Sequence, residues 1–322
     1  MGRLLAWQLA RAGHRVRVVD PASGPEQPGA AGFTAAGMLS PLAEREHAEP
    51  DVVALGWRSL ELWPAIAAAL GRPGLVKTEG SLLLAHGSDV GAAQRVLARL
   101  TDGPEPLNRA ALQMLEPALA PDLRAWWLPS EGQVLPHELL AALAKQAPDV
   151  DWLWGRRATT VQPRRIELDD SRRLDADLVI DTRGLGAKPD MPALRGVRGE
   201  ILWLHAPGVA LNRPARLMHP RHRVYLVPRP GDVIVVGASE VESEDRSPVS
   251  LRSAVELMAA AHSVLPDLAE ARIVHMETNL RPALPDHRPR IDHEPGLLRI
   301  NGLFRHGWLL APALAEKVIA HV

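Results

Sequence analysis

The chain has 322 residues, of which 46% are hydrophobic and 23% are charged, and its formal net charge at neutral pH is −1. This length allows one large or two ordinary domains, and the charge balance gives no general attraction to nucleic acids or anionic membranes. The sequence contains no cysteine, which excludes disulfides, thiolate metal sites, a thiol nucleophile and a cofactor attached through sulfur. No apolar run approaches the ~20 residues of a membrane span, and arginines and a histidine interrupt any signal-peptide core, so we expect a cytoplasmic protein.

The first twenty residues have the pattern of a βαβ unit after its first strand. An amphipathic helix that includes Leu4 and Leu9 ends near Gly13, and an alternating strand then ends at Asp20. In a dinucleotide fingerprint, glycines admit the pyrophosphate and an acidic residue about 20 positions later binds the ribose. Gly2 stands at the position of the third glycine, and Asp20 at that of the acid. The alternative is purely structural, with Asp20 as a turn residue and no nucleotide role for either.

The rest of the chain alternates between helical and strand patterns. Helices are expected at 51–70, 89–100, 109–115, 136–147, 250–264 and in the tail, and strands at 75–86, 158–162, 178–181, 197–205, 223–229, 233–237 and 272–281. The βα character at both ends and the β character of the middle predict an α/β fold of two interleaved domains. We expect a Rossmann-like nucleotide-binding domain from residues 1–45, 135–190 and 290–322. A β-rich α+β substrate domain is expected from residues 46–134 and 191–289.

Five motifs occur in an informative order: VRGEILWLH, RVYLVPR, DVIVVGASE, NLRPALPDHRP and GLFRHGWLLAP. Together they resemble the D-amino acid oxidase family of FAD-dependent oxidoreductases, and within it the glycine oxidases of thiamine biosynthesis. The resemblance covers nearly the whole chain, from Gly2 to the last helix. It implies non-covalently bound FAD in the Rossmann-like domain, whose first strand and first two fingerprint glycines are missing from this chain. We therefore expect the DNA just upstream to encode, in frame, a β-strand ending in G-x-G-x-x.

Three residues match the family's substrate site. Arg281, in NLRPALPD, corresponds to the arginine that binds the substrate carboxylate, a task that suits a guanidinium because it is always charged and binds carboxylates bidentately. Tyr225, the only tyrosine of the chain, corresponds to a second donor to that carboxylate, and Arg305 is a candidate for the pocket wall or a lid ion pair. The alternatives are a salt-bridged surface arginine and a tyrosine that is only packed.

A larger set of residues matches the FAD-binding positions. GLFRHGWLLAP has Leu303 where the family usually has histidine, and its helix start is an anion site that would face the flavin. The alternatives are ordinary loop and core packing. Besides Gly2 and Asp20, the set contains Thr34, Ala35, Ala36, Gly37, Met38, Ala158, Gly184, Gly302, Gly307, Trp308 and Leu309.

The resemblance implies oxidation of glycine or another small amino acid by hydride transfer to the flavin, giving an imine and hydrogen peroxide. Dioxygen is the expected electron acceptor, and the oligomeric state stays open. Other substrates of the same fold are D-amino acids or sarcosine-type amines, for an oxidase or a dehydrogenase, and a flavin-free remnant with a binding or structural role is a further alternative. We expect neither nucleic-acid nor membrane partners. No metal is expected either, because His219, His222, His287 and His293 lack supporting carboxylates or helical pairing.

Overall fold

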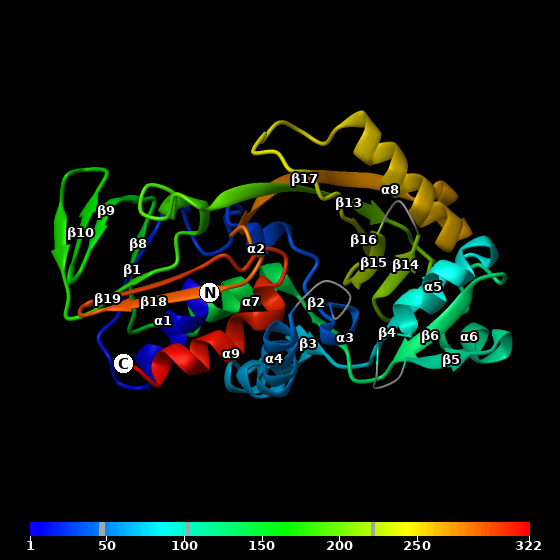
Figure 1. Ribbon diagram of the computed structural model, residues 1–322, viewed down its shortest axis with the longest axis horizontal. Helices are drawn as coiled ribbons and strands as arrows, with labels where there is room; N and C mark the ends of the chain where they lie inside the picture. The colour runs from blue at the N-terminus through cyan, green and yellow to red at the C-terminus, as the bar shows by residue number, and fades with distance from the viewer. Residues whose placement is uncertain (45–48, 99, 101–103, 220–222) are drawn as a thin grey trace.

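The computed structural model describes residues 1–44, 49–98, 100, 104–219 and 223–322. Figure 1 shows a helix-rich end, where both termini lie, and an opposite end built on a large sheet. In Figure 1 the chain passes between the two ends several times, and the domain bounds expected from the sequence stay a prediction. Among the described residues, no helix is long and apolar enough to cross a membrane.

The large sheet contains eight strands within the described part of the chain. They are β4 (Ser81–Ala85), β5 (Glu105–Leu107), β6 (Arg124–Leu128), β13 (Arg195–His205), β14 (Ala215–Met218), β15 (Arg223–Arg229), β16 (Val233–Gly237) and β17 (Arg272–Ala283). Their order is β17-β13-β16-β15-β14-β4-β6-β5, and only β14 and β4 run parallel. The sequence VIVVG of β16 is buried at four of its five positions, which fits a central strand covered on both faces. α8 (Leu251–Val264) packs against β13, β15 and β16.

Four long helices form the core of the other end. They are α1 (Gly2–Arg11), α4 (Pro50–Ala69), α7 (Pro136–Lys145) and α9 (Gly307–Ile319). Trp63 of α4 and Leu310 of α9 are fully buried in one apolar cluster with Leu139 of α7 and Leu4 of α1. α9 is apolar on nearly every side because it packs against both α1 and α4. This packing fixes the start of α9, which borders the site described below.

Short strands surround these helices. They are β1 (Arg17–Asp20), β2 (Met38–Leu39), β3 (Val76–Lys77), β7 (Gly132–Val134), β8 (Asp151–Trp154), β9 (Ala158–Gln162), β10 (Arg165–Leu168), β11 (Arg173–Asp175), β12 (Val179–Asp181), β18 (Arg290–Glu294) and β19 (Leu297–Asn301). β1 is parallel to β8, and β12 is parallel to β19. Within the described residues, the β8-β1 pair and the β12-β19-β18 sheet are not hydrogen-bonded to each other, although both border one cavity. The β-strand that we expect from the sequence to be encoded upstream stays a prediction.

The shorter helices connect these sheets. They are α2 (Ala31–Thr34), α3 (Pro41–Glu44), α5 (Val90–Leu97) and α6 (Arg109–Leu115). The structure confirms the helices and strands expected from periodicity and adds nine strands that the sequence did not predict, namely β2, β5, β6, β7, β8, β10, β11, β14 and β18. Seven of these nine have only two to four residues, too few to show a clear alternation.

Candidate functional site

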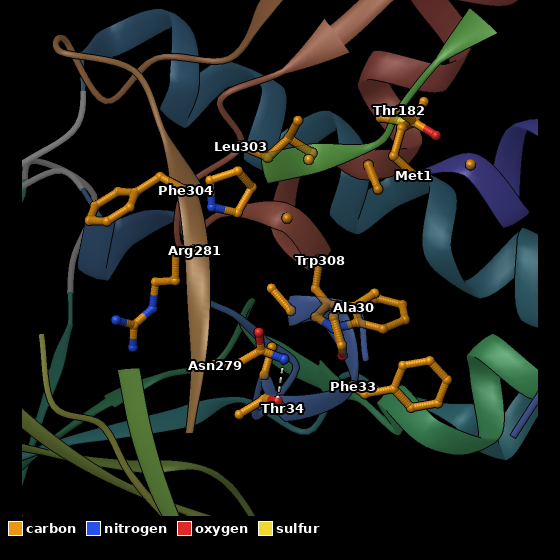
Figure 2. A pocket seen from close by; sticks show the side chains of 18 of the residues that line it. Met1, Ala30, Phe33, Thr34, Thr182, Asn279, Arg281, Leu303, Phe304 and Trp308 are labelled. Atoms are coloured by element: carbon orange, nitrogen blue, oxygen red, sulfur yellow. Dashed lines mark hydrogen bonds between the residues drawn. The ribbon is translucent and has the colours of Figure 1, made fainter. Parts of the chain in front are cut away.

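A cavity of about 3060 Å³ runs from the start of α1 to the surface of the large sheet. Elements far apart in the sequence line it, including α1, β12, β15, β17 and the start of α9. Its volume exceeds the ~300–1,000 Å³ of drug-sized pockets, so a dinucleotide and a small substrate can occupy it together. Figure 2 shows part of this cavity, with Asn279 and Arg281 on one strand and Trp308 nearby.

Arg281 occupies the sheet side of the cavity. Its Nη1 donates to the backbone oxygens of Arg198 at 3.2 Å and Ser239 at 3.1 Å, and its Nη2 also donates to Ser239 at 3.1 Å. No described carboxylate lies within ion-pair distance of this guanidinium. Burial lowers the pKa of Arg281, yet an arginine remains charged at neutral pH. A half-buried cation that lines a cavity and is paired with no carboxylate favours the binding of an anion.

Tyr225 lines the same part of the cavity, on β15. A Cβ atom on Gly237 of the adjacent strand would lie only 2.7 Å from the phenol oxygen, so the glycine makes room for the ring. Burial raises the pKa of Tyr225, while the positive charges of Arg281, Arg216 and Arg229 act in the opposite direction. The phenol is therefore a hydrogen-bond donor at neutral pH, as the sequence prediction requires.

Arg305 belongs to an ionic cluster that the sequence did not predict. Its Nη2 and Nε donate to Glu44 at 2.7 and 3.0 Å, and its Nη1 lies 3.5 Å from Glu240. The side chains of His306 and Arg216 also approach Glu44, at 3.5 and 3.8 Å. Burial would raise the pKa of Glu44, but the charges of Arg305, His306 and Arg216 lower it to about 2. Glu44 lies six residues after Met38, and His306 follows Arg305 directly, so proximity to residues that match the family is the only signal in the sequence.

The residues from Thr34 to Met38 also line the cavity. Thr34 donates to Glu277 at 2.7 Å and accepts a hydrogen bond of 3.0 Å from Asn279, the bond drawn in Figure 2. Ala35 and Ala36 expose only small side chains there, and Gly37 has a positive φ of 69°. The segment therefore allows close approach of a ligand to its backbone.

The first turn of α9 also borders the cavity, through Gly307, Trp308 and Leu309. His306 precedes this turn, and its side chain makes no capping hydrogen bond. The turn contains no acidic residue, so its N–H groups and the positive end of the helix dipole favour an anionic ligand. Trp308 is fixed in place because its indole donates to the backbone of Gly32 at 2.9 Å.

The nucleotide candidates at the amino end line the far part of the cavity. Gly2 begins α1, and a Cβ atom there would lie 2.7 Å from the hydroxyl of Thr182. Asp20 accepts a 2.9 Å hydrogen bond from the backbone of Ala22 and lies 3.6 Å from the guanidinium of Arg3. Arg3 was not singled out in the sequence, because nothing there indicated that it would be buried beside Asp20.

The remaining candidates divide into two groups. Gly184 and Ala158 line the cavity, and Gly184 has a positive φ of 56°. Gly302 does not line it. A Cβ atom there would lie 2.7 Å from Leu284, and φ is 74°, so glycine at this position allows a packed turn. Of the histidines considered above, His222 lies outside the described residues.

Comparisons with known proteins agree with this geometry. A family model described as FAD dependent oxidoreductase matches residues 1–321. A provisionally named thiamine biosynthesis oxidoreductase ThiO of Rhizobium etli is 41% identical over 318 residues, which are 98% of this chain and 92% of that protein. The crystal structure of glycine oxidase from Geobacillus kaustophilus superposes with a TM-score of 0.85 at 25% identity, covering 99% of this chain and 90% of the other. Iminodiacetate oxidase from Chelativorans sp. BNC1 gives a TM-score of 0.83 at 26% identity, covering 100% and 92%.

Proposed function

The chain belongs to the family of FAD-dependent oxidoreductases that includes glycine and D-amino acid oxidases, and on this basis we propose that it oxidises glycine or another small amino acid to the imine. The observation that supports a carboxylate substrate most directly is Arg281, a half-buried cation in the cavity with backbone carbonyls as its partners. The relative from Rhizobium etli supports a role in thiamine biosynthesis. A cytoplasmic location and the oligomeric state stay predictions.

Arg281 and Tyr225 would bind the substrate carboxylate together. The guanidinium provides charge-assisted hydrogen bonds, and the phenol adds a neutral donor from the neighbouring part of the sheet. Two fixed donors define the direction of the carboxylate, and they therefore orient the Cα–H bond of a small amino acid. Disturbing either donor should therefore appear mainly as weaker substrate binding, which raises KM, with a smaller effect of lost orientation on kcat.

The described residues fit FAD. The segment from Thr34 to Met38 and the first turn of α9 would border the flavin, while Gly2, Asp20, Ala158 and Gly184 would border the nucleotide part. When bound, FAD would supply the oxidising chemistry, since it accepts a hydride from the substrate, with dioxygen as the proposed final acceptor. The N–H groups of the first turn of α9 would stabilise negative charge on a group bound beside them, without any movement of the helix.

The proton chemistry of the site needs no general base from Glu44. A carboxyl group whose pKa is held at about 2 stays ionised at neutral pH and accepts a proton poorly. Glu44 instead fixes Arg305, whose guanidinium borders the cavity. The amine would therefore have to bind in its neutral form, and the rate should rise with pH as free substrate loses its proton.

Glu240 favours a second candidate within the same chemistry. This exposed carboxylate lines the cavity and lies 3.5 Å from Arg305, so one wall is polar, unlike the apolar wall expected for a site that accepts only glycine. A polar wall would suit a substituted amine or a larger D-amino acid. Peroxide formation measured over a panel of glycine, sarcosine and D-amino acids separates these cases. Activity on bulky D-amino acids without activity on glycine would contradict the glycine assignment.

The variant Arg281→Met tests the proposed function. Loss of a bidentate charged contact should raise the KM for glycine about 100-fold, because each hydrogen bond to a charged group contributes ~1.5–3 kcal/mol. Arg290→Met is a matched control, since Arg290 is exposed on β18 and pairs with Asp292, and neither residue lines the cavity. Equal KM values for the two variants would exclude Arg281 as the carboxylate site.

A further inference from the structure

The guanidinium of Arg281 lies directly on a glycine of the neighbouring strand. Arg281 is paired with Val197 in the register of β17 and β13, and its side chain reaches Gly199, two residues further along β13. A Cβ atom on Gly199 would lie 2.5 Å from both Cζ and Nη2 of Arg281. Real Cβ atoms do not come this close to other heavy atoms, so any other residue here would displace the guanidinium.

The same guanidinium is held from the side by Ser239. The backbone oxygen of Ser239 accepts hydrogen bonds from both terminal nitrogens of Arg281, each at 3.1 Å. Ser239 is itself fastened to β13, because its hydroxyl donates to Glu200 at 2.7 Å and accepts from the Glu200 backbone N–H at 3.0 Å. A third bond, from the Ser239 N–H to the Glu200 carbonyl, measures 3.2 Å. The position of the carbonyl that orients Arg281 therefore depends on Glu200.

Glu200 is fully buried and cannot change its position easily. Its Oε1 accepts hydrogen bonds from Nη2 of Arg198 at 2.7 Å and from the backbone N–H of Ser250 at 2.9 Å. Burial would raise the pKa of Glu200, but hydrogen bonds from Ser253, Ser250, Arg198 and Ser239 lower it to about 2. A buried ionised carboxylate with its partners in place makes a rigid support.

We propose that Gly199, Glu200 and Ser239 are positioning residues that aim the Arg281 guanidinium at the substrate carboxylate. The inference rests on the proposed function, in which Arg281 binds that carboxylate. The three residues do not touch the substrate in this account. Gly199 leaves space for the guanidinium of Arg281, the backbone oxygen of Ser239 fixes the direction of that guanidinium, and Glu200 holds Ser239 in position.

The test compares Gly199→Ala and Ser239→Ala with Gly196→Ala in the FAD-loaded protein. Gly196 is a matched control because it lies on the same strand. A Cβ there would meet only the flexible side chains of Leu280, Glu244 and Leu185, at 3.1 to 3.2 Å. Two quantities are measured: the Kd of acetate by calorimetry, and kcat and KM for glycine by peroxide formation. Acetate carries the carboxylate without the amine, so its Kd reports the proposed carboxylate site of Arg281 and Tyr225 without any contribution from the amine.

Gly199→Ala should raise both the Kd of acetate and the KM for glycine about 10- to 100-fold, with kcat changed less than about threefold. Ser239→Ala should raise both the Kd of acetate and the KM for glycine by about threefold to tenfold, because the Ser239 carbonyl remains but the residue loses both hydrogen bonds of its hydroxyl to Glu200. Gly196→Ala should match the parent protein. A general structural loss would lower stability or kcat without this selective change in KM.

Two negative results have different meanings. If Arg281→Met loses acetate binding but Gly199→Ala and Ser239→Ala bind acetate like the parent, the positioning inference is wrong and the proposed function stands. If Arg281→Met itself binds acetate like the parent, Arg281 is not the carboxylate site, and both proposals are overturned.

Discussion

Replacing Glu44 by glutamine should cost stability in a way that depends on pH. Burial alone would raise the pKa of Glu44, but Arg305, His306 and Arg216 lower it from its usual 4.5 to about 2. A carboxyl group with a lower pKa in the folded state adds stability above pH ~4.5, and this stability is lost as the pH falls toward ~2. Since one pKa unit corresponds to ~1.36 kcal/mol, the ionised carboxylate contributes roughly 3 kcal/mol at neutral pH.

Urea unfolding of the parent protein and Glu44→Gln at pH 7 and pH 3.5 measures this contribution. The difference in the free energy of unfolding should be roughly 3 kcal/mol at pH 7 and should narrow by about 1 kcal/mol at pH 3.5. Glu61→Gln is the control, because Glu61 is exposed on α4 and pairs only with Arg58 in the described part of the chain. The reasoning is refuted if Glu44→Gln loses no more stability than Glu61→Gln, or if its loss is the same at both pH values.

Four further results are expected. Tyr225→Phe should raise the KM for glycine about tenfold, as for one lost hydrogen bond to a charged group, with a smaller effect on kcat. Because burial raises the pKa of Tyr225 above 10, a plot of kcat/KM against pH should show no loss from its ionisation below pH 10. Gly237→Ala should reproduce the Tyr225→Phe defect, since its Cβ would displace the ring, and steady-state kinetics would show this. Glu240→Met should shift relative kcat/KM values toward smaller, less polar amines in the substrate panel.

The sequence predicted the long, strongly periodic elements well. α4, α8 and β16 follow from clear apolar periods, and the structure places them within a residue or two of the expected bounds. β8 was missed because DWLW has four residues and little alternation, although it is the parallel partner of β1. Whether such a short segment forms a strand depends on its pairing with a distant strand, and the pattern of a single sequence does not show that pairing.

In the candidate site, too, the sequence predicted some residues well and missed others. Arg281 and Tyr225 could be found because they belong to ordered motifs, and the structure brings both into one cavity. Glu44 could not be found, because its importance depends on a hydrogen bond from Arg305, which lies 261 positions further along the chain. His306 could not be found either, because its importance depends on its approach to Glu44. Which charged residues become buried neighbours is a property of the folded chain, so the ionic cluster had to come from the structure.

The central claim is that this chain is an FAD-dependent amine oxidoreductase, and anaerobic reduction of its flavin tests it most directly. Purified protein would be loaded with FAD, freed of excess cofactor and mixed with glycine and then with small D-amino acids in the absence of oxygen, while the flavin absorbance is followed. We expect the protein to retain flavin, and we expect the visible bands of this flavin to disappear when at least one of these amines is added. With Arg281→Met, we expect the same loss of absorbance to need a much higher amine concentration. Protein that retains no FAD, or bound FAD that no small amino acid reduces, would contradict the account.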